Sequence, residues 1–167
     1  FFTLYANTDG IKAELRTYST ELLDRYILSK TRVLLNNVTR HMEDYEIPSA
    51  CVEIRSFLDA LNNWYIRRSR DRFWKSDKDS DKISAYNTLY TVLHTFCKVA
   101  APFLPLLTEE VFKGLSGEKS VHLSDWPVAE MFPTEHELVR EMDRVRDICS
   151  TALSIREVYS LRTRLPL

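Results

Sequence analysis

Apolar residues recur every three or four positions along most of this chain, and that spacing predicts long helices. The predicted helices run from about 21 to 45, from 48 to 75, from 82 to 101, from 106 to 115 and from 134 to 159. Pro48 fits the first turn of the second helix, and Pro102 and Pro105 end the third, because a proline disfavours helical backbone in the residue before it. We therefore expect an all-α fold, an antiparallel helical bundle with an additional long C-terminal helix.

The ends of the predicted helices carry more detailed expectations. Thr20 is the expected N-cap of the first helix. Residues 48–75 are expected to form one uninterrupted helix. The spacing Thr134-x-x-Glu137 predicts a capping box at the start of the last helix.

Segments without helical spacing divide the chain. Residues 1–19 show no amphipathic period, so we expect an irregular lead-in. Residues 120–123 alternate between polar and apolar positions and favour a short strand, and residues 161–167 look like a second strand. The expected domains are a helical bundle at 20–127 and the start of a C-terminal region at 128–167.

The composition narrows the class of protein. The chain has 167 residues, 44% of them hydrophobic and 28% charged, with a formal net charge of −1. This balance excludes a strongly basic protein that coats nucleic acid through counterion release, and it excludes an acidic disordered tail. Only three glycines are present, which disfavours turn-dense all-β folds. No apolar run reaches the roughly 18 residues of a membrane span, so no membrane association is expected.

The cysteines indicate a reducing, cytoplasmic setting. Cys51, Cys97 and Cys149 lie far apart and form no C-x-x-C pair. We expect them to be buried small apolar side chains, with no disulfide framework and no zinc site.

Sequence signals of catalysis are absent. The chain contains no phosphate-binding glycine loop and no nucleophile elbow. The pair Glu109-Glu110 falls in the first turn of a predicted helix, where acidic side chains complement the helix dipole. His41, His94, His122 and His136 lack the spacing of metal ligands, and His94 is expected at the core or its boundary. We therefore expect no catalytic and no metal-binding residue.

A cluster of positive charge ends the second predicted helix. Five cations, Arg67, Arg68, Arg70, Arg72 and Lys75, surround a single acid, Asp71, which gives a local charge of +4. The cluster is equally compatible with structural ion pairs and with a surface that faces phosphates. Aromatic residues interleave with it at positions 64, 65, 73 and 74, and such residues either fill a core or stack on unpaired bases.

The first predicted helix offers a second polar surface. Lys30, Asn36, Asn37 and Arg40 combine amides, which can read base edges, with cations, which can hold phosphates. An ordinary solvated helix face is the alternative, and it stays open.

Several longer strings resemble the isoleucyl-tRNA synthetase family. They are Phe2-Thr3-Leu4-Tyr5-Ala6-Asn7, Asp24-Arg25-Tyr26-Ile27-Leu28-Ser29-Lys30, Asn62-Asn63-Trp64-Tyr65-Ile66-Arg67-Arg68-Ser69-Arg70-Asp71-Arg72-Phe73-Trp74, Ala101-Pro102-Phe103-Leu104-Pro105-Leu106-Leu107-Thr108-Glu109-Glu110 and Ser120-Val121-His122-Leu123-Ser124-Asp125-Trp126-Pro127. The resemblance covers residues 1–127 strongly and 128–167 more weakly. The Arg-Arg-Ser-Arg string favours the isoleucine family over the related valine family, which remains an alternative.

The resemblance implies a specific role. Synthetases of this family join isoleucine to its tRNA with ATP and Mg²⁺, and their HIGH-like and KMSKS-like catalytic motifs do not occur here. The chain therefore looks like the helical anticodon-binding domain of class I synthetases, preceded at 1–19 by a lead-in from the catalytic core. We expect a fragment that is monomeric, holds no cofactor, catalyses nothing by itself, and has isoleucine tRNA and the rest of a synthetase chain as partners.

Candidate RNA contacts follow from placing the polar surfaces within this resemblance. The expected tRNA-binding residues are Lys30, Asn37, Arg40, Asn63, Arg67, Arg68 and Arg70. The alternative from a different class is a protein-interaction bundle without an RNA role, which would use the apolar stripe of the last helix.

Overall fold

The computed structural model describes residues 1–162. These residues are helical apart from their connections, with no strand among them, and the predicted all-α bundle is confirmed. The chain divides into two compact units, 1–134 and 135–167, which are described separately below. The predicted domain boundaries at 19/20 and 127/128 remain predictions.

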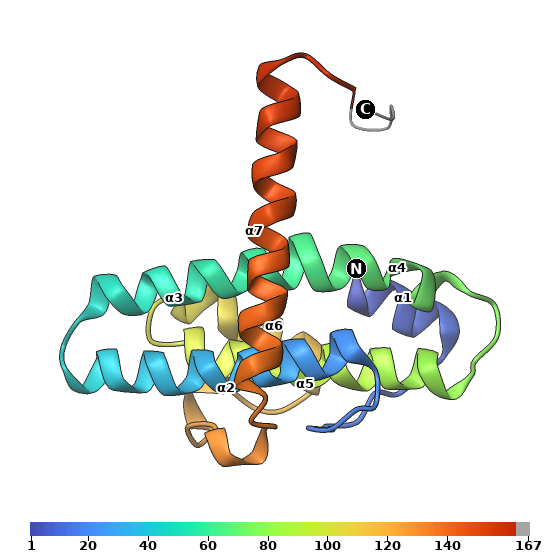
Figure 1. The fold of residues 1–167 in the computed structure, drawn as a ribbon. Coiled ribbons are helices and arrows are strands. Elements are labelled where there is room, and N and C mark those ends of the chain that lie inside the picture. The colour runs from blue at the N-terminus through green and yellow to red at the C-terminus, as the bar shows by residue number, and fades with distance from the viewer. Residues whose placement is uncertain (163–167) are drawn as a thin grey trace. The chain divides into compact units, whose positions relative to one another are not determined.

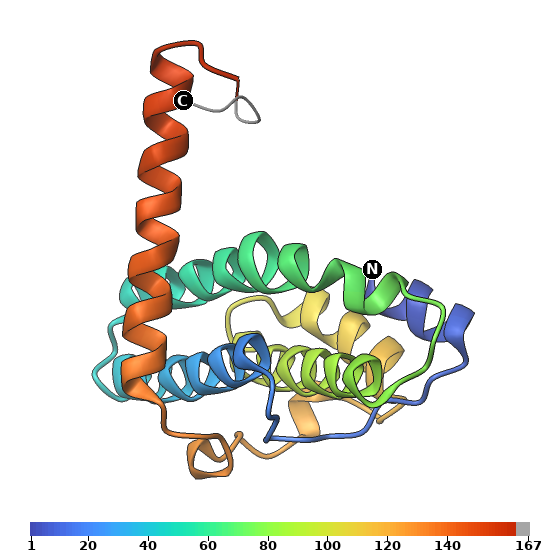
Figure 2. The ribbon, with the colours of Figure 1, turned by 45° about the vertical axis from the view of Figure 1, so that its right-hand side comes forward.

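Three long helical segments lie side by side in the first unit (Figure 1, Figure 2). They are α2 (Leu22–Glu43), the continuous run of α3 (Ile47–Asp59), η1 (Ala60–Ile66) and α4 (Arg67–Trp74), and α5 (Ser80–Ala100). Figure 1 shows that consecutive segments run in opposite directions, so the turn between α2 and α3 and the loop between α4 and α5 lie at opposite ends. The antiparallel arrangement agrees with the sequence-based expectation.

The second segment is not one uninterrupted α-helix, because η1 is a π-helix. Its buried residues after this point, Leu61, Tyr65, Ser69 and Phe73, are spaced four apart. At about 3.6 residues per turn, a spacing of four would drift steadily around an α-helix. The wider π turn takes up the difference. It therefore keeps the buried side of α4 in line with the buried side of α3.

Large aromatic side chains dominate the core between these segments. Tyr26, Tyr65, Tyr86, Phe57 and Phe73 are among the largest side chains that are fully buried. The rings of Phe73 and Tyr86 meet edge to face at 5.0 Å between centroids, a geometry that aromatic pairs prefer. This contact holds α4 against α5.

The N-terminal segment is more ordered than its sequence suggested. Residues 2–9 form the helix α1 (Phe2–Asp9), so the expected irregular lead-in is wrong for this stretch. The helix closes at Gly10, whose φ of +63° is the left-handed conformation that glycine adopts most easily. The extended residues that follow are held by α5, because the backbone N–H of Arg16 donates to Thr91 Oγ1 at 2.7 Å. An eight-residue helix is too short to show a hydrophobic period.

The predicted helix caps were wrong in two places. The N-cap of α2 is Glu21 rather than Thr20, and no side chain caps the helix there. The helix α7 (His136–Val158) begins after Glu135, so Thr134 and Glu137 do not form a capping box. In contrast, Asp79 caps α5 through its carboxylate, which accepts from the N–H of Lys82.

A short helical segment packs under the end of α5. The helix α6 (Pro105–Ser116) closes at Gly117, and the 3-10 helix η2 (Val121–Leu123) replaces the strand expected at 120–123. Glu109 joins the two, because it accepts from the backbone N–H of Val121 at 2.9 Å. A second 3-10 helix, η3 (Ala129–Met131), follows.

The second unit consists of α7 within the described residues. Ion pairs along its surface support it, between Arg140 and Glu137 and between Arg146 and Asp143. The strand expected at 161–167 lies largely outside the described residues, and 161–162 form no strand.

Candidate nucleic-acid interface

The helix α4 divides the cluster of positive charge between two faces. Ser69 and Phe73 point into the bundle and are buried. Arg67, Arg68 and Arg70 are exposed. We call these three arginines the outer face of α4. Helical phase turns Arg67 and Arg70, which are three residues apart, away from the side of Ser69 and Phe73, whereas Arg68 lies one turn before Arg72.

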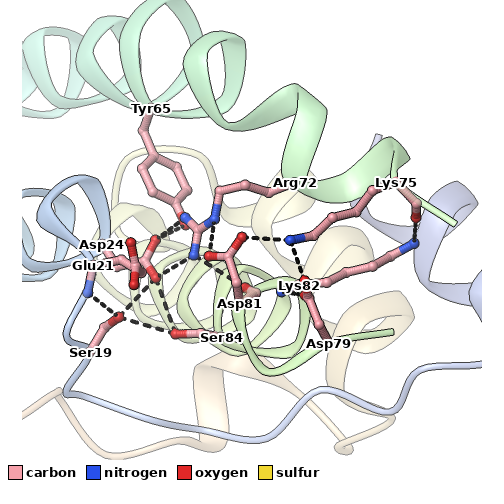
Figure 3. A network of polar contacts seen from close by, with 10 residues as sticks. All are labelled: Ser19, Glu21, Asp24, Tyr65, Arg72, Lys75, Asp79, Asp81, Lys82 and Ser84. Atoms are coloured by element: carbon pink, nitrogen blue, oxygen red, sulfur yellow. Dashed lines mark hydrogen bonds and ion pairs between the residues drawn. The ribbon is translucent and has the colours of Figure 1, made fainter. Parts of the chain in front are cut away.

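Arg72, one turn after Arg68, reaches into the bundle and forms a buried ion pair (Figure 3). Its Nη1 and Nη2 donate to the two carboxylate oxygens of Asp24 at 2.7 and 2.9 Å. Its Nε donates to Asp81 Oδ1 at 2.7 Å. The side chain of Asp24 is 0% exposed and that of Arg72 is 16% exposed. Such a fork-to-fork pair is the strongest geometry available to arginine and a carboxylate.

Further donors complete the hydrogen bonding of Asp24. Tyr65 Oη donates at 2.8 Å, Ser19 Oγ at 2.9 Å and Ser84 Oγ at 3.2 Å. Burial raises the pKa of Asp24, but the hydrogen bonds and charge of Arg72 outweigh it, with help from Tyr65, and hold that pKa below its ordinary value. Burial, reinforced by the charge of Asp24, raises the pKa of Tyr65 well above its ordinary value. The carboxylate therefore stays charged in the folded protein.

Lysines extend the network to the end of α4. Lys75 Nζ pairs with Asp79 at 2.7 Å and with Asp81 at 2.8 Å. Lys82, which is almost fully buried, pairs with Asp9 at 2.7 Å and donates to the carbonyl oxygen of Lys75 at 2.7 Å. Two of the five cations of the cluster, Arg72 and Lys75, therefore serve ion pairs within the bundle.

Aromatic rings lie beside two of the outer-face arginines. The guanidinium carbon of Arg68 is 3.8 Å from the ring centroid of Trp64, which is a close cation–π stack. That of Arg70 is 5.8 Å from the ring centroid of Trp74. The ring of Trp74 is 53% exposed, whereas Trp64 is half-buried. Of the two adjacent aromatic residues at positions 64 and 65, Tyr65 is part of the core, whereas Trp64 lies at the boundary of the core.

The remaining predicted contacts are spread over two helices. Asn63 is exposed on η1, and its Nδ2 donates to Asp59 Oδ1 at 2.6 Å. On α2, Arg40 is exposed, while Lys30 and Asn37 are half-buried. The Lys30 ammonium is 5.9 Å from the ring centroid of Tyr26. A role in RNA binding stays a prediction for all seven candidates.

Two exposed residues on the same strip of the long helix were not among the candidates. Arg55 on α3 and Trp74 on α4 are exposed alongside Asn63 and the outer face. Helical spacing was the signal for Arg55, which precedes Asn62 by seven residues, or about two turns. No local signal marks Asp24, because its partner Arg72 is 48 residues away.

Other sequence candidates have structural roles. Glu109 lies beyond the first turn of α6, so it does not serve the helix dipole as expected. A hydrogen bond from Lys113, opposed by desolvation and aided by the N–H of Val121, lowers its pKa to about 2. His94 is buried as predicted, with its ring 4.9 Å from that of Phe112.

The three cysteines differ in their exposure, and the described residues form neither a metal-binding group nor a membrane-spanning helix. Cys97 is buried, and burial raises its pKa to about 11, but Cys51 is exposed and Cys149 half-exposed, which corrects the expectation that all three are buried. Within residues 1–162, no group of three or more His, Cys, Asp or Glu side chains is arranged to hold a metal ion. No helix in that part of the chain has the length and apolar character needed to cross a membrane.

Comparison with known proteins shows which family the chain is similar to. Residues 24–167 match the family described as the anticodon-binding domain of tRNA ligase. The chain is 52% identical over its whole length to an isoleucine–tRNA ligase of Corynebacterium efficiens and 49% identical to one of Mycobacterium tuberculosis. An isoleucine–tRNA ligase of Leifsonia xyli is also 52% identical. In each case the chain spans 15% of the relative's length.

Proposed function

The chain belongs to the family of anticodon-binding domains of tRNA ligases, and from that premise we propose that it holds the anticodon stem-loop of an isoleucine tRNA within a longer isoleucine–tRNA ligase. The isoleucine assignment is supported by relatives that share about half of their residues with the chain over its full length. Of the strings that resemble the isoleucine family, residues 2–7 lie in α1, 24–30 in α2 and 62–74 in η1 and α4, while 101–110 lead into α6 and 120–127 include η2.

The observation that carries the proposal is the outer face of α4. Arg67, Arg68 and Arg70 are exposed on one helix, while the other two cations of the cluster are held in ion pairs. Exposed arginines that are not neutralised within the protein are the residues that bind phosphate best. The face therefore concentrates positive charge on a protein whose net charge is only −1.

The chemistry of a stem-loop fits this surface. Phosphate contacts fix the register of the RNA, and unpaired loop bases offer edges and faces to amides and aromatic rings. Asn63 and Trp74 are exposed on the same helical run as the arginines. The candidates on α2 would supply further contacts, with Arg40 the most exposed of them.

The remaining parts of the proposal concern the longer protein. Aminoacylation, with ATP and Mg²⁺, would take place in the part of the ligase outside this sequence, and the present chain would only position the tRNA. We propose a cytoplasmic protein and a monomeric chain, in keeping with a function in translation.

Binding to an anticodon stem-loop RNA tests this function. Replacing Arg67, Arg68 and Arg70 by Ala should weaken binding and flatten the plot of log affinity against log salt by about 2 to 3 units, since each phosphate contact contributes about one unit. A matched control replaces the exposed Lys12, Lys113 and Lys119 by Ala. It removes the same three charges, from −1 to −4, at other sites. The control should bind far more tightly than the arginine variant.

The outcomes separate the alternatives. Equal salt slopes in the two triple variants would refute an RNA role for the outer face. Equal affinity for stem-loops with isoleucine and valine anticodons would refute the isoleucine assignment but not the family.

A protein-interaction role for the last helix is the second candidate. Val145, Ile148, Ile155 and Tyr159 recur along α7 and are exposed. Exposed apolar stripes of this kind mark contact surfaces. Association that rises with concentration, and that disappears when the chain ends near Trp126, would support this role.

A further inference from the structure

The outer face and the ion pair of Arg72 both belong to α4, the last part of the continuous helical run from Ile47 to Trp74. The end of a helix frays unless contacts with the rest of the protein hold it. A phosphate contact, in contrast, requires the guanidinium at a defined place and direction. The direction of the outer face must therefore be set by what holds the inner side.

Asp24 is the point at which that inner side is held. Its carboxylate receives Tyr65 from η1, Arg72 from α4 and Ser84 from α5 (Figure 3). It sits at the start of α2 and is fully buried. One side chain of α2 thus holds both of the other long helical segments of the bundle.

Two of these ties lie next to the Trp64–Arg68 stack. Trp64 directly precedes Tyr65 in the chain, and Arg68 lies one helical turn before Arg72. The Tyr65 hydroxyl and the Arg72 guanidinium bond to the same oxygen of Asp24, at 2.8 and 2.7 Å. The two residues that form the stack are therefore close neighbours along the helix of the two residues that share one carboxylate oxygen.

We propose that Asp24 is a positioning residue: by holding Tyr65 and Arg72 it fixes the Trp64–Arg68 stack and directs the Arg68 guanidinium toward an RNA phosphate. This inference rests on the proposed function, since it names how one contact of that interface is built. Asp24 itself is fully buried, so we expect it to act without direct contact with RNA.

A double-mutant cycle in RNA affinity tests the inference. In the otherwise unchanged chain, Arg68→Ala should weaken binding of an anticodon stem-loop RNA about tenfold, the size of one lost charge-assisted hydrogen bond. In chains that carry Arg72→Met or Tyr65→Phe, the same replacement should cost less than about threefold, because Arg68 is no longer directed. Arg72→Lys should restore part of the cost.

A control separates positioning from general loss of stability. Phe112→Leu disturbs a core cluster of Cys97, Ala101, Phe112 and Val121, which includes no residue of the network. In that background Arg68→Ala should still cost about tenfold. All affinities are measured at a temperature at which circular dichroism shows each variant to be folded.

A second readout follows the stack itself. The indole N–H resonance of Trp64, assigned with Trp64→Phe, should shift in Arg68→Ala and shift similarly in Tyr65→Phe. Tyr65→Phe removes a single hydroxyl, so this readout remains if Arg72→Met does not fold.

Each outcome bears on one claim. A tenfold cost of Arg68→Ala in every background would overturn the positioning role while leaving the proposed function intact. No effect of Arg68→Ala alone, together with a strong effect of the triple arginine variant, would also overturn it. No effect of the triple variant would instead refute the proposed interface.

Discussion

The helix α4 carries arginines of two kinds, one paired with a carboxylate inside the protein and the others exposed to solvent. On the inner side, Arg72 meets a fully buried carboxylate through two parallel hydrogen bonds. On the outer side, Arg67 and Arg70 are exposed to solvent only five and two residues before Arg72. The sequence gives no sign of this difference, since all these arginines stand within six residues of one another.

The difference shows that a cluster of charge is not a single functional unit. Asp24 selects Arg72 because helical phase brings that position to the interior, and the π-helix η1 keeps that phase. The remaining arginines are left for solvent or for a ligand. The cluster therefore contains both kinds of residue. Arg72 forms a structural ion pair, whereas the exposed arginines are candidates for phosphate contact.

The sharpest test of this difference changes one residue on each side in the same way. Arg72→Met should lower the free energy of unfolding by about 3 to 5 kcal/mol, because it leaves the Asp24 carboxylate buried and unpaired. Arg70→Met should change it by less than about 0.5 kcal/mol, as surface replacements usually do. Urea unfolding at neutral pH measures both values. Similar losses in the two variants would contradict the division into two faces.

Acid should weaken the inner side in a predictable direction. The pKa of Asp24 is lowered in the folded state, so below about pH 4 the unfolded chain binds more protons than the folded one. The stability contributed by Asp24 is therefore present above its ordinary pKa and is lost as the pH falls through the folded-state pKa. The loss should be smaller than in Arg72→Met, because a protonated carboxyl can still form hydrogen bonds.

Comparison with Asp24→Asn isolates this contribution. The difference in unfolding free energy between the original chain and Asp24→Asn should shrink as the pH falls from about 5 toward 2. Glu109→Gln provides a second comparison, in which the difference should shrink in the same direction at a site in α6, because the pKa of Glu109 is also lowered. A difference for Asp24→Asn that stays constant over this range would mean that the carboxylate does not titrate with folding.

The sequence predicted the features that depend on interactions between residues close together in the chain better than those that depend on distant residues. The spacing of apolar residues predicted α2, α5 and α6 to within a few residues, because amphipathic helices depend on local order. It missed α1, which is too short to show a period. It also missed the π turn, because polar Ser69 interrupts the apolar spacing of four residues that η1 accommodates.

The candidate interface shows the same contrast between local features and contacts between distant residues. The exposure of Arg67, Arg68 and Arg70 agrees with their choice as contacts. The pairing of Arg72 with Asp24 joins residues 48 positions apart and depends on how α2 packs against η1. No local pattern contains that information.

Ser69 provides a smaller test, of opposite sign, on the inner side. Its hydroxyl is buried and has no hydrogen-bond partner within the described residues. Ser69→Ala should therefore raise the free energy of unfolding by about 1 kcal/mol, through relief of that unpaired group and better helix propensity. Differential scanning calorimetry would show a higher Tm. A lower Tm would indicate that the hydroxyl bonds to a water molecule inside the bundle.

The smallest expected effects rank the outer face itself. Arg68 stacks on Trp64 at 3.8 Å, and Arg70 lies 5.8 Å from Trp74. A cation–π contact at a partly exposed site contributes about 0.5 to 1 kcal/mol and weakens with distance. In the absence of RNA, Arg68→Ala should thus lower stability by about 0.5 kcal/mol or more, and Arg70→Ala by less. In a chain that carries Trp64→Leu, Arg68→Ala should no longer lower the free energy of unfolding. Equal losses for Arg68→Ala and Arg70→Ala in urea unfolding would contradict this ranking of the two contacts by distance.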